Sequence, residues 1–452
     1  MSATPEPPVS LWPDPDCLGT LTDLYQLTMM AGYRAAGRAD DSATFELFVR
    51  RLPHQRAYLV FAGLEQAIGD LLRLRFSAAQ IEALRELPAF ARVEPEFFAS
   101  LATMRFEGDV WAVPEGTVVF AGEPLVRVQA SLAQAQWVET FLLASLGYPT
   151  LVASKASRIV DAAAGRPVHD FGLRRGHGPH AGMLAARSSY LAGCASTSNV
   201  EAAIRLGIPV TGTMAHSWVQ SFETEAEAFA AYSLTFPDTT TLLVDTYDTP
   251  TGIERAAAVE PPIRAVRIDS GDLAALARQG RAILDRLGRR ETSIVGSGDL
   301  DEFSIGELVA RGVPYDAFGV GTEMITSRDA PALSMVYKLV ELNGVGRIKL
   351  SPGKKTYPLA KQIHRFSLPD GTFSHDLVTG AGESSGGEPL LRQVVSGGRL
   401  TSPLPTLEAI RGHCRDQIAR LPASLRRPDS EPGYLVDYSD FLEDEARRLG
   451  VK

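Results

Sequence analysis

RAVRIDSGDLAALARQGRAILDRLGRRETSIVGSG, residues 264–298, contains a predicted β-strand, an α-helix and a second β-strand in succession. The apolar runs at 264–270 and 292–298 have the length of strands, and both end in polar residues. The apolar residues at helical spacing in the segment between them, 272–288, are Leu273, Leu276, Ile283, Leu284 and Leu287. A strand–helix–strand unit of this length predicts parallel strands joined by a right-handed crossover.

The same rhythm extends over residues 137–351. Further apolar runs with polar ends are PVHDFG (167–172), IPVTGT (208–213), TLLVDT (241–246) and YDAFGVGT (315–322), and VYKLVEL (336–342) is another candidate strand. This many units favours an irregular α/β barrel over an open sheet. Because such barrels carry their active sites at the carboxyl ends of the strands, the polar residues there are candidates for binding and catalysis.

Two other parts of the chain, 1–136 and 352–452, lack this rhythm. The first is expected to contain a helix over 22–33, with Thr22 as its N-cap, and short antiparallel strands rich in valine and glycine. The second is expected to contain loops, short strands and two helices. Three segments with boundaries at about residues 136 and 351 are therefore predicted.

The composition narrows the class of protein. Apolar residues make up 45% and charged residues 22% of the 452 residues, which is typical of a globular protein with a sizeable core. A net charge of −9 argues against nucleic acid as a partner, because phosphate backbones attract basic surfaces. No stretch has the apolar length of a membrane span and no signal sequence is recognisable, so we expect a cytoplasmic protein without a membrane partner. Cys17, Cys194 and Cys414 lie far apart without a CxxC motif, and reduced thiols are expected.

Arg267 and Asp269 are the most informative charged residues. They alternate with Val266 and Ile268, so both charged side chains point to the same side of the predicted strand. If the apolar pair faces the helices, a cation and a carboxylate face the interior of the barrel. A buried pair is costly unless ligand or partner charges compensate for it, which favours a binding role. A purely structural ion pair is the alternative.

Glycine-containing turns follow two later strands. In SGDLDEF (297–303), Asp299 stands beside Gly298 and could bind ribose hydroxyls or cap the next helix. The residues of FGVGTEMITSRD (318–329) that suit a phosphate, by close backbone approach, a hydroxyl or a positive charge, are Gly319, Gly321, Thr322 and Arg328. A tight strand-to-helix turn without a ligand has the same pattern.

Three further strand ends carry side chains suited to an anionic ring. Phe171 could stack on a flat ring, and Arg174 could pair with its negative charge. The loop after IPVTGT holds Thr213 and His216, for which a packing or capping histidine is the alternative to a catalytic one. Asp245 could orient other groups or a solvated metal ion.

Together these segments resemble the nicotinate phosphoribosyltransferases along nearly the whole chain. The stretches that carry the resemblance are TDLYQLTM, PEGTVVFAGEPLVRV, HDFGLRRGHG, GTMAHSW, VRIDSGDL, SGDLDEF, FGVGTEM and KKTYPLAKQIHR (354–365). The resemblance implies a catalytic α/β barrel over 137–351 beside an α/β sandwich formed by 1–136 and 352–452. It also implies synthesis of nicotinate mononucleotide from nicotinate and phosphoribosyl diphosphate, coupled to ATP hydrolysis, as a salvage step toward NAD.

The resemblance also assigns roles to residues. His216 resembles a histidine that ATP phosphorylates, and it forms the expected catalytic set with Arg267 and Asp269. The residues expected to bind the nicotinate ring are Phe171, Arg174, Ser198, Thr213 and Arg267, with Tyr25 reaching the ring from the other subunit of a homodimer with shared active sites. Asp299 resembles a ligand of the ribose, and the residues that resemble the 5′-phosphate site are Gly319, Gly321, Thr322 and Arg328. Asp245 and Gly298 are further residues expected to bind substrate. Magnesium is expected with the diphosphate near Asp269 and Asp299, and no metal is expected to be held by the protein alone.

Other functions share part of this pattern. A nicotinamide phosphoribosyltransferase has an aspartate, near the position of Ser198 here, that accepts a hydrogen bond from the ring amide. A serine does not repel a carboxylate, so nicotinate is favoured. A quinolinate phosphoribosyltransferase would require neither the His216 loop nor this length. An inactive nucleotide-binding relative would be free to lose the functional residues, and all four of the most telling are present: His216, Arg267, Asp269 and Asp299.

Overall fold

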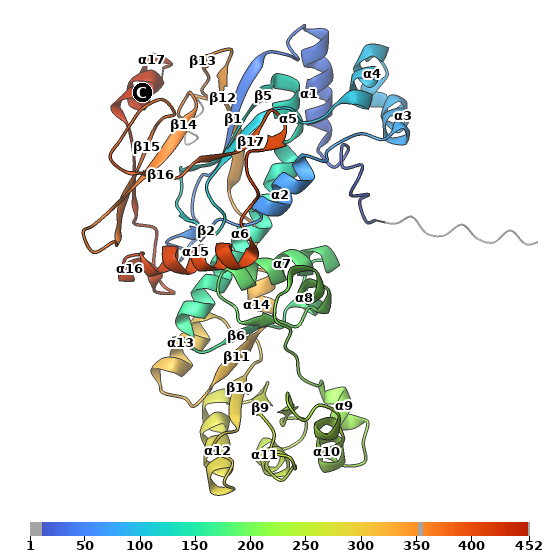
Figure 1. The fold of residues 1–452 in the computed structure, drawn as a ribbon, viewed down its shortest axis with the longest axis vertical. Helices are drawn as coiled ribbons and strands as arrows, with labels where there is room; N and C mark the ends of the chain where they lie inside the picture. Colours follow the sequence, from blue (N-terminus) through green and yellow to red (C-terminus); the bar gives the residue numbers. More distant parts are fainter. Residues whose placement is uncertain (1–10, 351–355, 451–452) are drawn as a thin grey trace, which may run out of the picture.

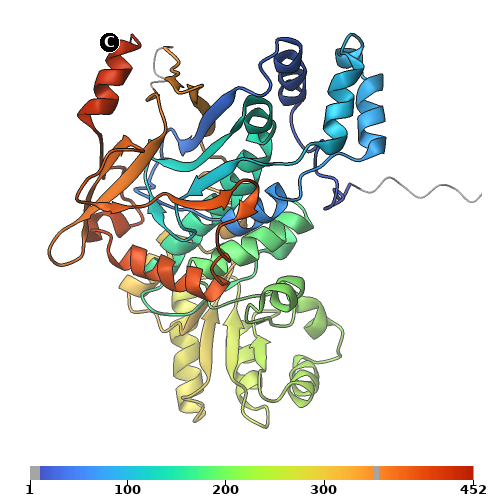
Figure 2. The ribbon, with the colours of Figure 1, turned by 45° about the horizontal axis from the view of Figure 1, so that its top comes forward.

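A computed structural model describes residues 11–350 and 356–450, and Figures 1 and 2 show it from two directions. Antiparallel sheets built from both ends of the chain form one part of the molecule, at the top of Figure 1. A parallel sheet built from the middle of the chain forms the other part, at the bottom. The long helix α6 (Glu139–Ala162) contacts elements of both parts. Lys354 and Lys355, the first residues of the predicted KKTYPLAKQIHR motif, lie outside the described residues.

The parallel sheet has six strands in the order β7-β6-β11-β10-β9-β8. Their bounds are β6 (Val168–Asp170), β7 (Ser196–Thr197), β8 (Thr241–Leu243), β9 (Ala265–Ile268), β10 (Ser293–Gly296) and β11 (Ala317–Val320). The predicted α/β class with parallel strands is confirmed. Within the described residues the order stops at β7 and β8, so the sheet is a half-barrel rather than a closed barrel. The expected strand at 208–213 is reduced to a single bridge between Thr197 and Val210.

Helices alternate with these strands along the chain. Their bounds are α7 (Pro179–Leu191), α8 (Val200–Leu206), α9 (His216–Gln220), α10 (Glu225–Thr235), α11 (Thr249–Ala257), α12 (Leu273–Arg286), α13 (Glu302–Ala310) and α14 (Thr322–Ile325), with a 3-10 turn at Leu173–Arg175. In α12, Asp272 caps the N-terminus by accepting a hydrogen bond from the backbone N–H of Ala275. Ile283 and Leu284 are buried as predicted, whereas Leu287 follows the last helical residue and is exposed.

The antiparallel part unites distant segments of the chain. Its main sheet has the order β13-β12-β1-β5-β3-β17-β18. Beside it lie the pair β2-β4 and a four-stranded sheet β16-β14-β15-β19, in which β19 alone pairs parallel, with β15. The bounds are β1 (Ser42–Val49), β2 (Leu59–Val60), β3 (Asp109–Ala112), β4 (Val118–Val119), β5 (Pro124–Ser131), β12 (Met335–Leu342), β13 (Val345–Gly346), β14 (Lys361–Ser367), β15 (Phe373–Gly380), β16 (Glu388–Pro389), β17 (Arg392–Ser396), β18 (Arg399–Leu400) and β19 (Leu435–Tyr438). The expectation that VYKLVEL forms one of the parallel strands is therefore wrong. The segment lies in β12, which pairs antiparallel with β1.

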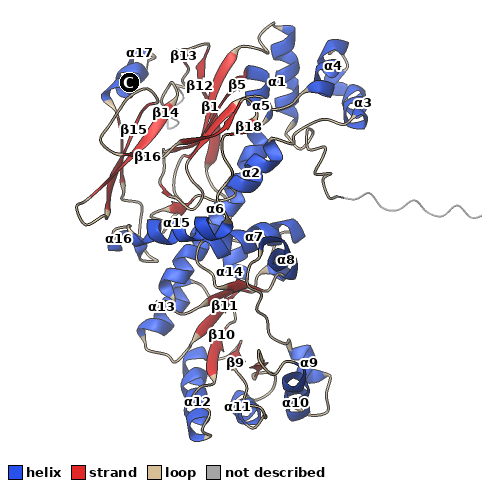
Figure 3. Cartoon of the chain, in the orientation of Figure 1, coloured by secondary structure: helices blue, strands red, loops and turns tan. Residues whose placement is uncertain are grey.

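The remaining helices lie around the antiparallel part and at its junction with the parallel part (Figure 3). They are α1 (Leu24–Ala35), α2 (Leu64–Leu71), α3 (Ala78–Glu86), α4 (Pro95–Thr103), α5 (Leu132–Trp137), α15 (Leu407–Ala419), α16 (Ala423–Arg426) and α17 (Asp440–Arg448), with a 3-10 turn at Pro88–Phe90. Thr22 does not cap α1. The N-cap is Asp23, and the Thr22 hydroxyl donates instead to the carbonyl oxygen of Trp137 (3.4 Å).

Two hydrophobic cores hold these layers. One fills the space between the parallel sheet and its helices, and its members include Val266, Ile268 and Ile294. The other lies between the main antiparallel sheet and the helices of the N-terminal segment. Cys17, Cys194 and Cys414 are free thiols, as predicted. Within residues 11–350 and 356–450, no helix has the length and apolar character that crossing a bilayer requires.

Candidate active site

Most of the predicted site residues lie at the carboxyl ends of neighbouring parallel strands or in the loops that follow them. β6, β11, β10 and β9 are adjacent in the sheet, so the loops after them meet at one edge. Phe171 follows β6, Gly321 follows β11, Asp299 follows β10 and Asp269 follows β9. The fold therefore gathers residues that are far apart in sequence.

Arg267 is the centre of a hydrogen-bond network at this edge. Its Nε donates to Ser297 Oγ (2.7 Å), its Nη1 to Thr213 Oγ1 (2.8 Å) and its Nη2 to Asp269 Oδ1 (2.6 Å). The guanidinium carbon lies 5.4 Å from the centroid of the Phe171 ring, within the range of a cation–π contact. A guanidinium has five N–H donors, so two of them have no acceptor among the described residues and are available to a ligand.

The Asp269 carboxylate is bonded through one oxygen only. Oδ1 accepts from Arg267 and also from Ser297 Oγ (2.6 Å), whereas Oδ2 receives no hydrogen bond from any part of the chain that the structure describes. Burial alone would raise the pKa of this carboxyl, but the Ser297 hydrogen bond and the Arg267 guanidinium outweigh burial and lower the pKa, and His216 adds to their effect. Asp269 is therefore an anion at neutral pH with one oxygen open to a ligand.

Asp245 joins the loop after β8 to the loop after β9. Its Oδ2 accepts from the backbone N–H of Asp269 (2.9 Å) and from Ser270 Oγ (2.7 Å). Its Oδ1 is buried and has no hydrogen-bond partner among the described residues. Next along the chain, Thr246 Oγ1 lies 3.0 Å from Nδ1 of His216, the first residue of α9. Because buried polar atoms are normally paired, this oxygen is available to a water molecule or a ligand at the site.

A small cavity of about 90 Å³ adjoins Arg267. The residues that line it are Phe171, Arg174, Ser198, Gly212, Thr213 and Arg267. The loop that carries Ser198 is fixed by its backbone N–H, which donates to the carbonyl oxygen of Asp170 (2.8 Å). The buried Asp170 carboxylate in turn accepts from the Thr197 hydroxyl (2.7 Å). Five residues predicted from sequence to bind the ring thus share one cavity.

Asp299 is not a helix cap. The N-cap of α13 is Asp301, whose side chain forms a capping box with Ser304. Asp299 is exposed and has a positive φ of 46°, and it follows Gly298, which packs against the backbone of Asp269. Gly298 lies so close to the preceding loop that a Cβ there would be 2.0 Å from the carbonyl oxygen of Asp269. The capping alternative for Asp299 is therefore wrong, and the glycine beside it is required by space.

The turn after β11 packs against Phe171. A Cβ at Gly319 would lie 2.5 Å from two carbons of the Phe171 ring, so this contact needs a glycine. Gly321 precedes α14, and Thr322 is the first residue of that helix. The backbone of the predicted phosphate turn therefore lies next to Phe171, which also lines the ring cavity.

Two predicted residues are not joined to this network. Arg328 is exposed, and its Nη1 forms an ion pair with Glu323 Oε1 (2.8 Å) in the same turn. Tyr25 lies on α1 in the antiparallel part, at the opposite end of the molecule from β9 in Figure 1. It does not line the ring cavity of its own chain.

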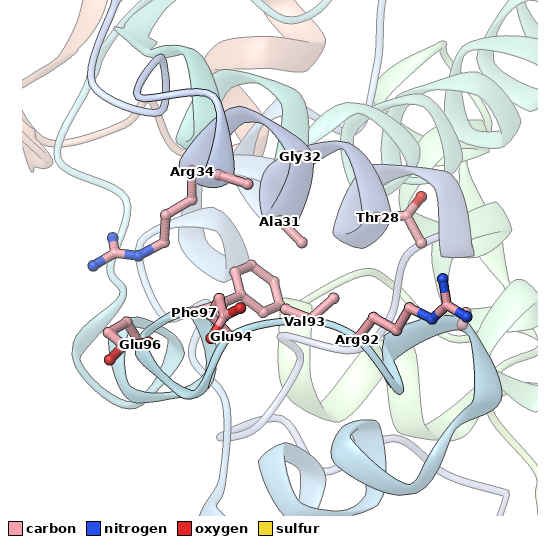
Figure 4. Close-up of a pocket in the computed structure, with 11 residues that line it drawn as sticks. Thr28, Ala31, Gly32, Arg34, Arg92, Val93, Glu94, Glu96 and Phe97 are labelled. Carbon is pink, nitrogen blue, oxygen red and sulfur yellow. The ribbon is translucent and has the colours of Figure 1, made fainter.

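At least three larger cavities lie outside this site, and two of them have volumes of several hundred Å³. One of about 730 Å³ lies between α6, α7, α15 and α16. The other, of about 570 Å³, lies between α1 and the segment around Phe97, with Arg34 and Arg92 at its two ends (Figure 4). Neither is lined by any predicted site residue. The largest cavities and the polar strand ends therefore lie in different places, and the candidate site is the one at the strand ends.

Sequence reasoning did not single out Ser297 and Thr246. Both are hydroxyl residues at the carboxyl ends of predicted strands, within segments already quoted for their aspartates. That position is a usable signal. Their hydrogen-bond partners, Arg267 and His216, cannot be read from the sequence. They follow from the fold, which places the end of β10 beside β9 and the start of α9 beside the loop after β8.

Comparisons with known proteins agree with this geometry. The family models that match are the nicotinate phosphoribosyltransferase (NAPRTase) N-terminal domain over 20–147, the nicotinate phosphoribosyltransferase (NAPRTase) family over 167–378 and the nicotinate phosphoribosyltransferase C-terminal domain over 383–445. The chain is 46% identical over 436 residues to nicotinate phosphoribosyltransferase pncB2 of Mycobacterium tuberculosis, with 95% of this chain and 93% of the relative covered.

More distant relatives show the same similarity. A nicotinate phosphoribosyltransferase of Bacillus subtilis is 41% identical, with 77% of this chain and 73% of the relative covered. The crystal structure of human nicotinic acid phosphoribosyltransferase superposes with a TM-score of 0.84 at 30% identity, and the match covers 95% of this chain and 99% of the human one. The similarity thus extends over both parts of the fold.

Proposed function

The chain belongs to the nicotinate phosphoribosyltransferase family, and we propose that the residues around Arg267 perform the reaction of that family. The protein is an enzyme that forms nicotinate mononucleotide in NAD salvage. The observation that carries the assignment of the site is the Arg267 network, which presents two unbonded N–H groups beside an aromatic ring and a small cavity.

Nicotinate has a flat aromatic ring and a negative charge, and the ring cavity contains a side chain that suits each of them. Two N–H groups of one guanidinium match the two oxygens of a carboxylate, so Arg267 binds the carboxylate of nicotinate. Phe171 provides an aromatic surface for the pyridine ring. Ser198, Thr213 and Arg174 line the same cavity and complete the pocket.

The reaction forms a bond between the ring nitrogen and C1 of the ribose, and it breaks the bond between C1 and the diphosphate oxygen. Positive charge develops on the ribose as the diphosphate leaves. The open oxygen of the Asp269 carboxylate stabilises that charge, because a fixed anion in a partly buried site costs no reorganisation. Asp299, at the rim, is placed to accept hydrogen bonds from ribose hydroxyls.

The phosphate groups need positive or dipolar partners in a chain of net charge −9. The turn formed by Gly319, Gly321 and Thr322 lets backbone amides approach the 5′-phosphate closely. Arg328 contributes its charge only if its guanidinium exchanges Glu323 for the phosphate, which its exposure allows.

Magnesium fits the oxygen atoms that the site leaves open. The unpartnered buried Oδ1 of Asp245, Oδ2 of Asp269 and the exposed carboxylate of Asp299 are the oxygen ligands that this ion prefers. Within 11–350 and 356–450 no group of three or more His, Cys, Asp or Glu residues could hold a metal ion, so the proposed ion also needs oxygen atoms of the diphosphate. Bound there, magnesium would neutralise charge on the leaving diphosphate.

His216 is the proposed acceptor of a phosphoryl group from ATP. Its ring lies close enough to Asp269 to influence the pKa of that carboxyl, and its Nδ1 lies 3.0 Å from the Thr246 hydroxyl. A hydrogen bond on one ring nitrogen fixes the orientation of the ring. This placement at the edge of the site supports a role in coupling rather than in the packing of a core.

Nicotinate should be used at least about 100-fold more efficiently than nicotinamide, because a carboxylate pairs with Arg267 and a neutral amide does not. The measurement is the ratio of kcat/KM for the two bases, with phosphoribosyl diphosphate, magnesium and ATP present. In Arg267→Gln the ratio should fall toward one. Similar kcat/KM values for the two bases in the unaltered enzyme would contradict the assignment of the ring pocket.

We expect a homodimer in which Tyr25 of one chain completes the site of the other. Tyr25 is one of three exposed apolar residues of α1, with Leu24 and Met29, and Leu21 just before the helix is exposed as well; exposed apolar residues this close together are typical of an interface. Its distance from the ring cavity of its own chain leaves a second chain as the only route by which it could reach a ring.

Mixing Tyr25→Ala chains with Asp269→Ala chains should restore activity. Each variant alone should be inactive, whereas half of the dimers in an equal mixture contain one intact site, which gives roughly one quarter of the normal activity. The control mixes Tyr25→Ala with the double variant Tyr25→Ala/Asp269→Ala, where no intact site can form. A monomer that is fully active at assay concentrations would rule out shared sites.

A further inference from the structure

Ser297 lies between the two charged groups of the ring and ribose site. It is 2% exposed. Its Oγ accepts a hydrogen bond from Arg267 Nε (2.7 Å) and donates one to Asp269 Oδ1 (2.6 Å). One hydroxyl, directly after β10, therefore connects a cation at the end of β9 with an anion in the loop that follows β9.

The backbone fixes the position of this hydroxyl. The N–H of Ser297 donates to the carbonyl oxygen of Ile268 (2.9 Å), which continues the parallel pairing of β10 with β9 beyond the last strand residue. The next residue, Gly298, lies against the carbonyl oxygen of Asp269 with no room for a Cβ. Ser297 is thus held on both sides, and its side chain cannot withdraw without breaking the contact between the two strand ends.

A hydroxyl suits this position because it donates one hydrogen bond and accepts others at the same atom. Its single proton serves the Asp269 oxygen, and a lone pair serves the Arg267 N–H. An alanine could do neither, and the thiol of a cysteine does both weakly. By occupying Nε of Arg267 and Oδ1 of Asp269, the hydroxyl leaves other donors of the guanidinium and the second carboxylate oxygen for substrates.

We propose that Ser297 is a positioning residue for both substrates. It orients the Arg267 guanidinium toward the carboxylate of the base and the Asp269 carboxylate toward the ribose, and it does so without contacting either substrate. The inference depends on the roles given to Arg267 and Asp269 in the proposed function. It adds that one side chain, directly after the neighbouring strand, contacts both groups and contributes to the orientation of each.

The test compares Ser297→Ala, Ser297→Cys and Ser297→Thr in the full-length enzyme. In a mixture of nicotinate and nicotinamide, the ratio of the two products reports the discrimination between the bases and does not depend on how much of the enzyme is folded. Ser297→Ala should lower this ratio about 10-fold or more, the effect of losing a hydrogen bond to a charged group. The KM for nicotinate should rise and kcat should fall together, because both orientations are lost.

The cysteine and threonine variants separate hydrogen bonding from volume. Cysteine fills nearly the same space as serine, so Ser297→Cys should resemble Ser297→Ala. Threonine keeps the hydroxyl, so Ser297→Thr should retain most of the discrimination. Ser233→Ala is the matched control, because Ser233 on α10 is also buried and its hydroxyl has no hydrogen-bond partner among the described residues. It should leave the ratio unchanged.

Two results would overturn the inference. If Ser297→Ala keeps the wild-type product ratio and loses only total activity, Ser297 has a structural role alone. If Ser297→Cys retains full discrimination, volume and not hydrogen bonding is what the site needs. Arg267→Gln in the same assay separates failure of the proposed function from failure of the positioning role. A wild-type product ratio in Arg267→Gln would reject the proposed function itself. A collapsed ratio in Arg267→Gln together with an unchanged ratio in Ser297→Ala would reject only the positioning role of Ser297.

Discussion

Replacing Asp269 by asparagine should lower kcat by about 100-fold or more, equivalent to about 2.7 kcal/mol of transition-state stabilisation. The substitution keeps the size of the side chain and most of its hydrogen-bonding capacity, so the loss isolates the negative charge. The oxygen that Asp269 leaves unbonded is the one available to the positive charge that develops on the ribose. Steady-state kinetics with saturating nicotinate and phosphoribosyl diphosphate measure the effect.

The stability of this variant decides between a catalytic carboxylate and a structural ion pair. A catalytic role predicts a Tm close to that of the unaltered protein, because Ser297 and Arg267 can still bond to the amide oxygen. A structural role predicts a lower Tm with normal activity per folded molecule. That second pattern would contradict the assignment.

Asp301→Ala is the matched control for the loss of a nearby carboxylate. Asp301 follows the same strand as Asp299 but caps α13 through its capping box with Ser304. Its removal should cost roughly 1 kcal/mol of stability, as the loss of a helix cap does, and leave kcat per folded molecule unchanged. The pair of variants thus separates the two roles that a carboxylate after a strand can have.

Much of the site could be predicted because it depends on local patterns. The alternation of Val266 and Ile268 with Arg267 and Asp269 fixes which side chains share a face, and the parallel-strand rhythm indicates which end of each strand carries function. Those two rules place the charged pair correctly. They also identify the polar residues at the ends of the other apolar runs as candidate site residues.

What could not be predicted depends on partners far away in sequence. VYKLVEL has the apolar character of a buried parallel strand, but its antiparallel partner β1 begins near residue 42, so its sheet is decided by tertiary packing. The hydroxyl of Thr22 had the usual position of an N-cap, yet it bonds to Trp137 instead. Ser297 likewise gains its meaning only from the strand beside it.

Whether the parallel strands form a closed barrel also depends on residues that are far apart in sequence. The run at 208–213 has the composition of a strand, but Val210 makes only one bridge, to Thr197. A strand becomes part of a sheet through its neighbours, and the count of apolar runs therefore overestimates the number of strands. The edge of the sheet that carries the candidate site does not depend on closure, because β6, β11, β10 and β9 are contiguous.

His216→Ala should abolish ATP hydrolysis and the incorporation of acid-labile phosphate, while slow synthesis of nicotinate mononucleotide continues without ATP. The diphosphate of the substrate is already a good leaving group, so phosphoribosyl transfer itself needs no histidine nucleophile. A histidine at the rim of the site therefore calls for a different role. Phosphorylation would add negative charge beside Asp269 and Asp245, where magnesium is expected to gather, and could order the loop that α9 begins.

The kinetic signature of that role is a raised KM for phosphoribosyl diphosphate in His216→Ala, because the phosphorylated enzyme is the form expected to bind this substrate more tightly. Each tenfold gain in affinity corresponds to about 1.4 kcal/mol, which ATP hydrolysis readily supplies. His375→Ala is the control for the loss of a histidine, since His375 stacks on Phe366 in β14, within the C-terminal sheet, and should leave coupling intact. A histidine that only packs the loop would instead lower the Tm of His216→Ala and keep ATP turnover per folded molecule. Stoichiometric ATP turnover by well-folded His216→Ala would therefore exclude the coupling role.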